Sequence, residues 1–205
     1  MNTLLIATIR TENEIRDLVN EIKSTVITNL KLIISSSKNS VAINVNRGLN
    51  ESVGQFVLKV DDDITGFSHG WDAKLIHPFS HIDNLEVISA RLLNTDGSVQ
   101  WTCSRDLNLF GMLSFPNNPI VPFCCVAFKK DSLRMDENFI GSGYDDADYC
   151  CQLRLKNIHS KFAINNEVRV IHKHEQKNAQ LSENAIYFRS KWKDIIFADG
   201  MGAVE

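Results

Sequence analysis

Apolar and polar positions in the early part of the chain follow one another in blocks typical of alternating strands and helices. Residues 3–9 and 30–34 are short apolar runs of the kind found in buried strands. Between them, apolar residues recur at helical spacing as far as Ser24, after Thr11 and Glu14 form a capping-box pattern. Strand, helix and strand joined by short links predict the start of a parallel β/α sheet with right-handed connections.

The next block leads into a cluster of acids. Residues 41–45 predict a short extended piece, and residues 46–53 predict a brief helix closed by Gly54. Residues 56–60 hold four apolar positions out of five, which predicts a third buried strand. This strand runs directly into the three consecutive carboxylates of residues 61–63.

After residue 63 the pattern is more broken. A turn of hairpin type lies at residues 94–97, and prolines interrupt residues 106–122, which predicts a long loop of the kind that is often functional. The other expected elements are helices over residues 69–79, near 130–134, over 145–156 and over 182–197, and strands over 85–92, 98–103, 123–128, 161–164 and 168–171. Since no break in composition marks a linker, we expect one α/β domain over residues 1–205, with a mostly parallel central sheet, flanking helices and a small antiparallel element.

Composition narrows the range of functions. Hydrophobic residues make up 43% of the chain, and no apolar run approaches the ~18 residues of a membrane helix. The N-terminal residues lack the features of a signal peptide, and the five cysteines are an odd number. Both observations favour a cytoplasmic protein, soluble or peripherally membrane-associated, with reduced thiols. The formal net charge of −3 gives no support to nucleic-acid binding through bulk charge.

The acids of residues 61–63 point to a binding site. Adjacent carboxylates at a strand end repel one another, a cost that is usually tolerated where a cation or a ligand hydroxyl lowers it. Ligands also bind at the carboxyl ends of strands in α/β sheets. The alternative interpretation is a solvated acidic turn.

Two further groups carry related chemistry. Asp145 and Asp146 open the helix expected over residues 145–156, where acids also serve simply to complement the helix dipole. His172 and His174 follow the last expected strand, and the alternative for each is an ordinary surface or core histidine. Carboxylates together with imidazole suit a divalent metal such as Mn²⁺ or Mg²⁺. A zinc site joining these histidines to the cysteines is disfavoured, because neighbouring residues in a strand face opposite ways.

Several segments occur in an order known from one enzyme family. They are the Asn-Arg-Gly-Leu run at residues 46–49, the turn and strand at 53–57, the acidic triplet at 61–63, the strand at 124–130, the glycine loop and acidic pair at 139–148, and Val-Ile-His at 170–172. Through these segments, most of residues 3–175 resembles the nucleotide-sugar glycosyltransferases of the GT-A fold, especially family 2. The resemblance implies a Rossmann-like domain with a nucleotide-binding half (residues 1–63), an acceptor-binding half (64–180) and a C-terminal helix (181–205).

On the donor side, the resemblance implies that Asp61 contacts the donor ribose. Asp63 would bind the metal that bridges the donor diphosphate, with Asp61 and Asp62 as further donor or metal contacts. His172 would complete the metal site, with His174 as a less favoured substitute. The implied cofactor is Mn²⁺ or Mg²⁺, and the implied donor is a nucleoside-diphosphate sugar, with a UDP-sugar as the default.

On the acceptor side, the resemblance implies that Asp146 is the general base, supported by Asp145. One base without a carboxylate nucleophile fits inversion at the anomeric carbon. The remaining implied contacts are Arg47 and Arg10 with the donor phosphates, and Gly143, Tyr144 and Trp101 with the acceptor.

The chain departs from the family in one place. Serines at residues 35–37 stand where family 2 proteins carry an Asp-rich turn that recognises the base. This departure motivates an alternative, a non-catalytic nucleotide- or sugar-binding module on a degenerate scaffold; a metal-dependent nucleotidyltransferase or phosphatase is a third hypothesis. The acceptor stays open among saccharide, lipid-linked sugar, protein and modified nucleic-acid base, as does the formation of a homo-oligomer.

Overall fold

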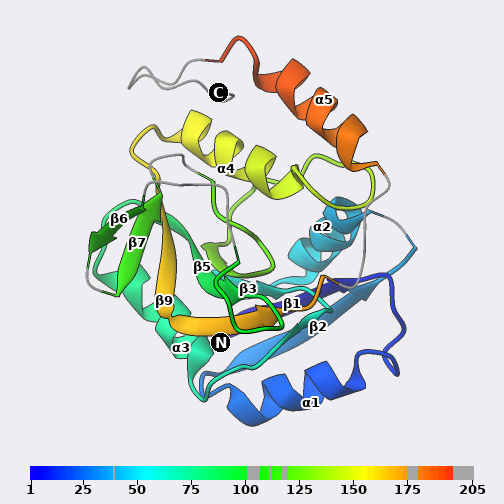
Figure 1. Ribbon diagram of the computed structural model, residues 1–205, viewed down its shortest axis with the longest axis vertical. Helices are drawn as coiled ribbons and strands as arrows, with labels where there is room; N and C mark the ends of the chain where they lie inside the picture. Colours follow the sequence, from blue (N-terminus) through cyan, green and yellow to red (C-terminus); the bar gives the residue numbers. More distant parts are fainter. Residues whose placement is uncertain (39, 101–106, 111, 117–119, 175–179, 196–205) are drawn as a thin grey trace.

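Figure 1 shows the computed structural model of the chain, which describes all residues except 39, 101–106, 111, 117–119, 175–179 and 196–205. The described helices are α1 (Arg16–Thr25), α2 (Val41–Glu51), α3 (Trp71–Ile76), the short 3₁₀ helix η1 (His77–Ser80), α4 (Asp145–Lys156) and α5 (Leu181–Trp192). The described strands are β1 (Asn2–Thr8), β2 (Leu30–Ser36), β3 (Phe56–Val60), β4 (Ile64–Thr65), β5 (Leu85–Leu93), β6 (Leu107–Phe110), β7 (Leu113–Pro116), β8 (Cys125–Lys129) and β9 (Lys161–His172).

The described strands join one sheet. Its order is β2-β1-β3-β8-β5-β9-β7-β6, with β4 paired to the end of β9. Strand β1 pairs in parallel with β2 and β3, and β5 pairs in parallel with β9. Strand β8 runs antiparallel between β3 and β5, and β4, β6 and β7 add antiparallel pairs. The expected α/β fold, with helices flanking a parallel sheet to which antiparallel strands are added, is confirmed.

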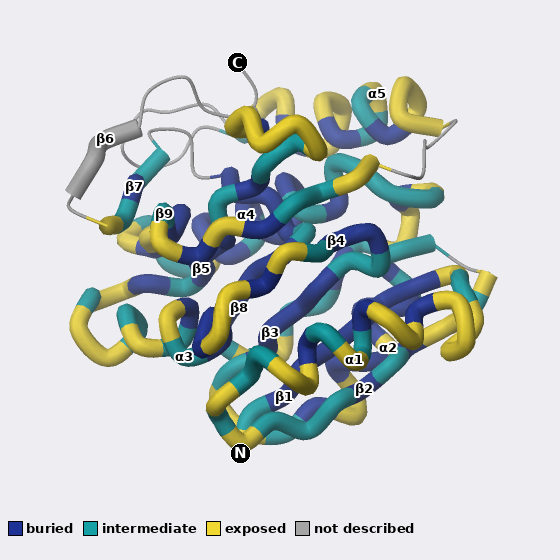
Figure 2. The backbone as a smooth tube through the Cα atoms, turned by 60° about the horizontal axis from the view of Figure 1, so that its bottom comes forward, coloured by how far each residue is buried: buried dark blue, intermediate teal, exposed yellow. Residues whose placement is uncertain are grey.

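Successive side chains of β3 point to opposite sides of the sheet. Leu58 and Val60 point into a core shared with α1 and α3, whereas Val57 points into a second core shared with α2 and α4. Lys59 follows Val57 on the second side and is buried although it is charged. Figure 2 shows that the central strands are buried along most of their length. The acids of residues 61–63 therefore extend from one of the most deeply buried strands of the sheet.

Helix α5 forms an additional layer outside α4 (Figure 1). Phe188 and Trp192 of α5 pack with Cys151 of α4 and with Phe139 in a third apolar cluster. The Trp192 indole also donates a 2.7 Å hydrogen bond to the carboxylate of Asp148, which is fully buried. The C-terminal helix is thus fixed to α4 by both apolar packing and a buried polar contact.

The structure corrects the prediction for residues 41–45. They form the first turn of α2 rather than an extended piece. The Ser40 hydroxyl caps the helix by accepting a hydrogen bond from the Ile43 amide at 3.4 Å. Val41, Ile43 and Val45 alternate as in a strand, but Val45 and Leu49 are buried one helical turn apart against the sheet. The cap and this burial decide in favour of the helix.

The stretch predicted as a loop over residues 106–122 contains the antiparallel hairpin of β6 and β7. The helix predicted near residues 130–134 is also wrong, because the Leu133 amide binds the Asp131 carboxylate at 2.6 Å in a local turn. Among the described helices, none is both long enough and apolar enough to cross a membrane.

The late strands differ from the prediction in their extent. The strands expected over residues 161–164 and 168–171 are one continuous strand, β9, which contains an irregularity in its pairing with β5. The strand expected over residues 98–103 is reduced to a single bridge between Leu93 and Val99 as far as the described residues reach, and residues 101–103 lie outside them.

Candidate active site

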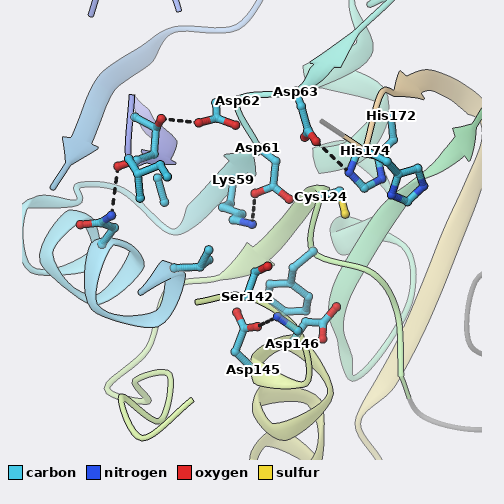
Figure 3. Close-up of a pocket in the computed structure, with 17 residues that line it drawn as sticks. Lys59, Asp61, Asp62, Asp63, Cys124, Ser142, Asp145, Asp146, His172 and His174 are labelled. Carbon is cyan, nitrogen blue, oxygen red and sulfur yellow. Dashed lines mark hydrogen bonds and ion pairs between the residues drawn. The ribbon is translucent and has the colours of Figure 1, made fainter. Parts of the chain in front are cut away.

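A pocket of about 250 Å³ lies where β3 ends. In Figure 3, the acids of residues 61–63 line one side, Asp145 and Asp146 lie across from them, and His172 and His174 lie beside Asp63. The other residues lining it come from β1, α2, β3 and the segments before β8 and α4: Ala7, Thr8, Ile9, Val41, Asn44, Lys59, Phe123, Cys124, Ser142 and Gly143. Three groups that lie far apart in the sequence therefore meet at one cavity.

Lys59 supplies a fixed positive charge to this pocket. Its ammonium pairs with Asp61 Oδ1, and the residue is only 2% exposed. Burial alone would lower the pKa of Lys59, but the nearby Asp61 carboxylate, with a smaller contribution from Asp145, raises that pKa above its ordinary value. Lys59 is therefore charged at any physiological pH. Lys59 was not among the predicted site residues; the signal for it was a lysine inside an otherwise apolar strand that leads into acids.

Asp62 turns toward strand β1. The Thr8 hydroxyl donates to Asp62 Oδ2, and Arg10 Nε lies 3.6 Å from the same oxygen. Burial raises the pKa of Asp62, and the contacts with Thr8 and Arg10 offset part of that rise. Arg10 does not line the pocket itself, but it contacts a carboxylate that does.

Asp63 meets His172 because β4 pairs with the end of β9, with Ile64 opposite His172. His172 Nε2 lies 3.3 Å from Asp63 Oδ2. The other ring nitrogen, Nδ1, lies 3.1 Å from the side-chain oxygen of Gln100. Gln100 was not among the predicted site residues, and nothing in the sequence marks it.

His174 stacks on His172, with 4.0 Å between the ring centroids. Its backbone is left-handed, with φ of +53°. Burial, and then the neighbouring His172, lower the pKa of His174, which keeps its ring neutral near pH 7. Both predicted histidines line the pocket, and His172 is the one whose ring nitrogen faces a carboxylate.

The Asp63–His172 pair fits a divalent metal in the chemistry of its donor atoms. Two ligands at about 2.1 Å from one ion can lie as far as about 4.2 Å apart, so the observed 3.3 Å allows both atoms to reach it. The described residues contain no group of three or more His, Cys, Asp or Glu side chains placed to hold a metal. That finding is compatible with Mg²⁺-like ions, which are commonly bound by one or two carboxylates together with substrate phosphates.

The segment before α4 follows an unusual path. Gly141, Gly143 and Tyr144 all have left-handed backbones, with φ of 70°, 97° and 68°. This path aims the Gly143 amide at Asp145 Oδ1, 2.8 Å away. Asp146 accepts a 2.8 Å hydrogen bond from the amide of Ala147.

Asp145 is buried and Asp146 is half-buried on the side of the pocket across from Lys59. Burial raises the pKa of Asp145 to about 7, with a further contribution from the adjacent Asp146 charge. Burial likewise raises the pKa of Asp146, against the opposing effects of the Ala147 amide and Lys59. Both shifts raise the carboxylate pKa values toward neutral pH, which suits a carboxylate that accepts a proton there.

Asn184 of α5 holds this segment in place. The residue is 2% exposed. Its side-chain oxygen accepts from the Ile140 amide at 3.0 Å, and its Nδ2 donates to the carbonyls of Ile140 at 2.9 Å and Gly143 at 3.0 Å. A helix some 40 residues downstream thus fixes the wall that carries Asp145.

Of the remaining residues predicted to contact donor or acceptor, only some line the pocket in the part of the chain that the structure describes. Gly143 lines the pocket, whereas Tyr144 and Arg47 do not; Arg47 is exposed on α2. The same helix places Asn44 in the pocket instead, where its Nδ2 donates to the Thr8 carbonyl at 3.0 Å. Trp101 lies outside the described residues.

Comparison with known proteins gives a fold but no sequence family. No protein-family model and no curated protein sequence matches the chain. Among solved structures, the crystal structure of GalNAc-T7 with UDP, GalNAc and Mn²⁺ matches with a TM-score of 0.69 at 10% identity, covering 95% of this chain and 48% of that one. The crystal structure of A197 from STIV matches with a TM-score of 0.57 at 12% identity, covering 84% of this chain and 85% of that one. The chain has the GT-A fold.

The fold expected from the order of sequence motifs is therefore confirmed. This chain spans about half of the GalNAc-T7 chain, at 48%. At 10–12% identity the likeness concerns the GT-A fold, and what the pocket does has to be argued from its own residues.

Proposed function

We propose that this protein is a metal-dependent, inverting glycosyltransferase that moves a sugar from a nucleoside-diphosphate sugar to a hydroxyl acceptor. One observation carries the proposal: a single pocket at the end of β3 joins Asp61–Asp62–Asp63 and His172 on one side to the Asp145–Asp146 pair on the other. A donor that leaves as an anion needs the first group, and an acceptor hydroxyl that loses its proton needs the second. The GT-A fold, found also in GalNAc-T7 with its UDP and Mn²⁺, supports the assignment.

On the donor side, Asp63 and His172 would hold Mn²⁺ or Mg²⁺, which when bound supplies a Lewis acid for the departing diphosphate. Asp61 would contact the ribose. Lys59 fixes the orientation of the Asp61 carboxylate and balances its charge before any ligand arrives. Asp62, held by Thr8, would serve as the further donor contact.

On the acceptor side, Asp146 would take the proton from the acceptor hydroxyl as its oxygen attacks the anomeric carbon. The bond from that carbon to the diphosphate oxygen breaks, and its electron pair leaves with the nucleoside diphosphate. Attack from the face opposite the leaving group inverts the anomeric centre. Asp145, held by the Gly143 amide, would support the base from its buried position, where burial and the adjacent Asp146 charge raise the pKa of Asp145.

A screen of nucleoside diphosphates and their sugars by thermal shift, with and without Mn²⁺, tests the donor half of the proposal. We expect a Mn²⁺-dependent rise in Tm with one nucleotide, with UDP-sugars as the first candidates. Release of nucleoside diphosphate from the matching sugar donor then separates an enzyme from a binding module. Tight donor binding without any hydrolysis or transfer would favour the module.

A further inference from the structure

Gln100 reaches the pocket region through a short return of the chain after β5. The turn at residues 94–97 closes with the Asn94 amide 2.8 Å from the Ser98 carbonyl. Val99 then bridges to Leu93, and the Gln100 amide donates to the Leu92 carbonyl at 3.0 Å. Gln100 is 8% exposed as a residue, and its side-chain oxygen lies 3.1 Å from His172 Nδ1.

This contact favours the tautomer of His172 that carries its proton on Nδ1. The side-chain oxygen of Gln100 has only lone pairs to offer, so His172 Nδ1 must be the donor in this hydrogen bond. In the neutral ring, Nε2 then keeps its lone pair. That nitrogen faces Asp63 Oδ2 at 3.3 Å, so two electron-pair donors are directed at the same small space.

We propose that Gln100 is a positioning residue for the metal site: it holds His172 in the Nδ1–H tautomer and directs Nε2, with Asp63, toward a divalent cation. The inference rests on the proposed function, in which Asp63 and His172 bind the metal. Metal-bound histidines characteristically donate their second ring N–H to a carbonyl or carboxylate, and loss of that partner typically costs about 10–100-fold in metal affinity. Gln100 supplies such a carbonyl.

The test compares two substitutions of nearly equal size. Gln100→Leu removes the acceptor, and Gln100→Glu keeps an acceptor oxygen in its place. Mn²⁺ affinity in the presence of UDP, measured by electron paramagnetic resonance of free Mn²⁺, is expected to fall about 10–100-fold in Gln100→Leu. It is expected to stay at or above the wild-type value in Gln100→Glu. Gln55→Leu, the same change at an exposed position, is the matched control and should leave the affinity unchanged.

A second measurement does not depend on the variants folding or on metal. Long-range ¹H–¹⁵N correlation spectra of the metal-free wild-type protein report which ring nitrogen of His172 is protonated. A neutral ring protonated on Nδ1 supports the inference, and a ring that carries a proton on Nε2 overturns it. Equal Mn²⁺ affinity in wild type and Gln100→Leu also overturns it. If the wild type binds no Mn²⁺ with any nucleotide, the proposed metal site itself is wrong.

Discussion

His172 Nε2 lies 3.3 Å from Asp63 Oδ2, although more than half of the chain separates the two residues. The contact follows from the pairing of β4 with the end of β9, which places Ile64 opposite His172. The two-residue strand β4, directly after the acids, is enough to place Asp63 beside the end of β9.

Asp63→Ala is expected to abolish Mn²⁺-dependent donor binding while the fold survives, because it removes one proposed ligand at the edge of the sheet. Titration calorimetry with the best donor, with Mn²⁺ and with EDTA, measures this. Asp83→Ala, at an exposed carboxylate outside the pocket, is the control. Wild-type donor and metal binding by Asp63→Ala would show that the metal site lies elsewhere.

Asp146→Asn is expected to retain donor binding and to lose turnover by about 10²–10⁴-fold, the usual contribution of a general base. The asparagine oxygen can still accept the 2.8 Å hydrogen bond from the Ala147 amide, so the local backbone has no reason to move. Release of nucleoside diphosphate is the measurement, with exposed Asp17→Asn as control. Unchanged turnover would remove Asp146 as the base and leave Asp145 as the candidate.

The raised pKa of Asp145 also predicts how stability depends on pH. The folded-state pKa is about 7, against an ordinary value of 3.8. As pH rises from about 4 to 7, the unfolded chain loses this proton before the folded protein does, so the free energy of unfolding falls across that window. Asp145→Asn does not titrate, so it avoids this fall in the free energy of unfolding. It should be more stable than wild type at pH 8 by about 1 kcal/mol or more, and nearly equal to it at pH 4.

Urea denaturation of wild type and Asp145→Asn at pH 4 and pH 8 measures the difference. A stability difference that does not change between the two pH values would contradict the raised pKa.

Lys59→Met is expected to destabilise the protein by about 2 kcal/mol, because it leaves the partly buried Asp61 carboxylate without its partner. The double variant Lys59→Met/Asp61→Asn should recover most of that loss, because it removes both charges together. Lys129→Met is a matched control on the same sheet. Lys129 pairs with Glu86 in a more exposed setting and should cost less than about 1 kcal/mol. Additive single effects in the cycle would mean that Lys59 and Asp61 do not interact.

Asn184→Ala is expected to cost about 3 kcal/mol, since it removes a buried side chain that bonds the Ile140 amide and three backbone carbonyls of the same segment. Hydrogen exchange of the Ile140 amide should accelerate, and turnover should fall more than donor affinity. Ser182→Ala, exposed on the same helix, is the control. Unaltered exchange at Ile140 would show that other contacts hold the segment.

The sequence predicted the parts of this fold that local pattern determines. The burial of β3 and the bounds of α4 follow from apolar spacing and from acids at a helix start, and the structure confirms them. The helix at residues 41–45 was missed because Val41, Ile43 and Val45 also alternate like a strand, and only packing on the sheet shows the other period. Where the local pattern allowed either strand or helix, packing against the sheet selected the helix.

The site was predictable as a set of acids and histidines, but not as a set of contacts. Asp63 and His172 could be named from the sequence, yet their meeting depends on a strand pairing that no local pattern encodes. Gln100 and Asn184 carry no signal of their own, because they act through side-chain hydrogen bonds to partners distant in the chain. Trp101, predicted as an acceptor contact, lies outside the described residues and stays a prediction.

The contact between Asn184 and the segment before α4 gives the wall that carries Asp145 and Asp146 a support that the acids of residues 61–63 do not share. The acids of residues 61–63 depend on the sheet, whereas Asp145 and Asp146 depend on α4 and, through Asn184, on α5. Changes in α5 can therefore reshape the wall that carries Asp145 and Asp146 with less effect on the wall formed by residues 61–63. Under the proposed function, acceptor preference would be free to diversify on an inherited donor site, and a library randomised over the face of α5 that carries Asn184 would be the place to redirect it.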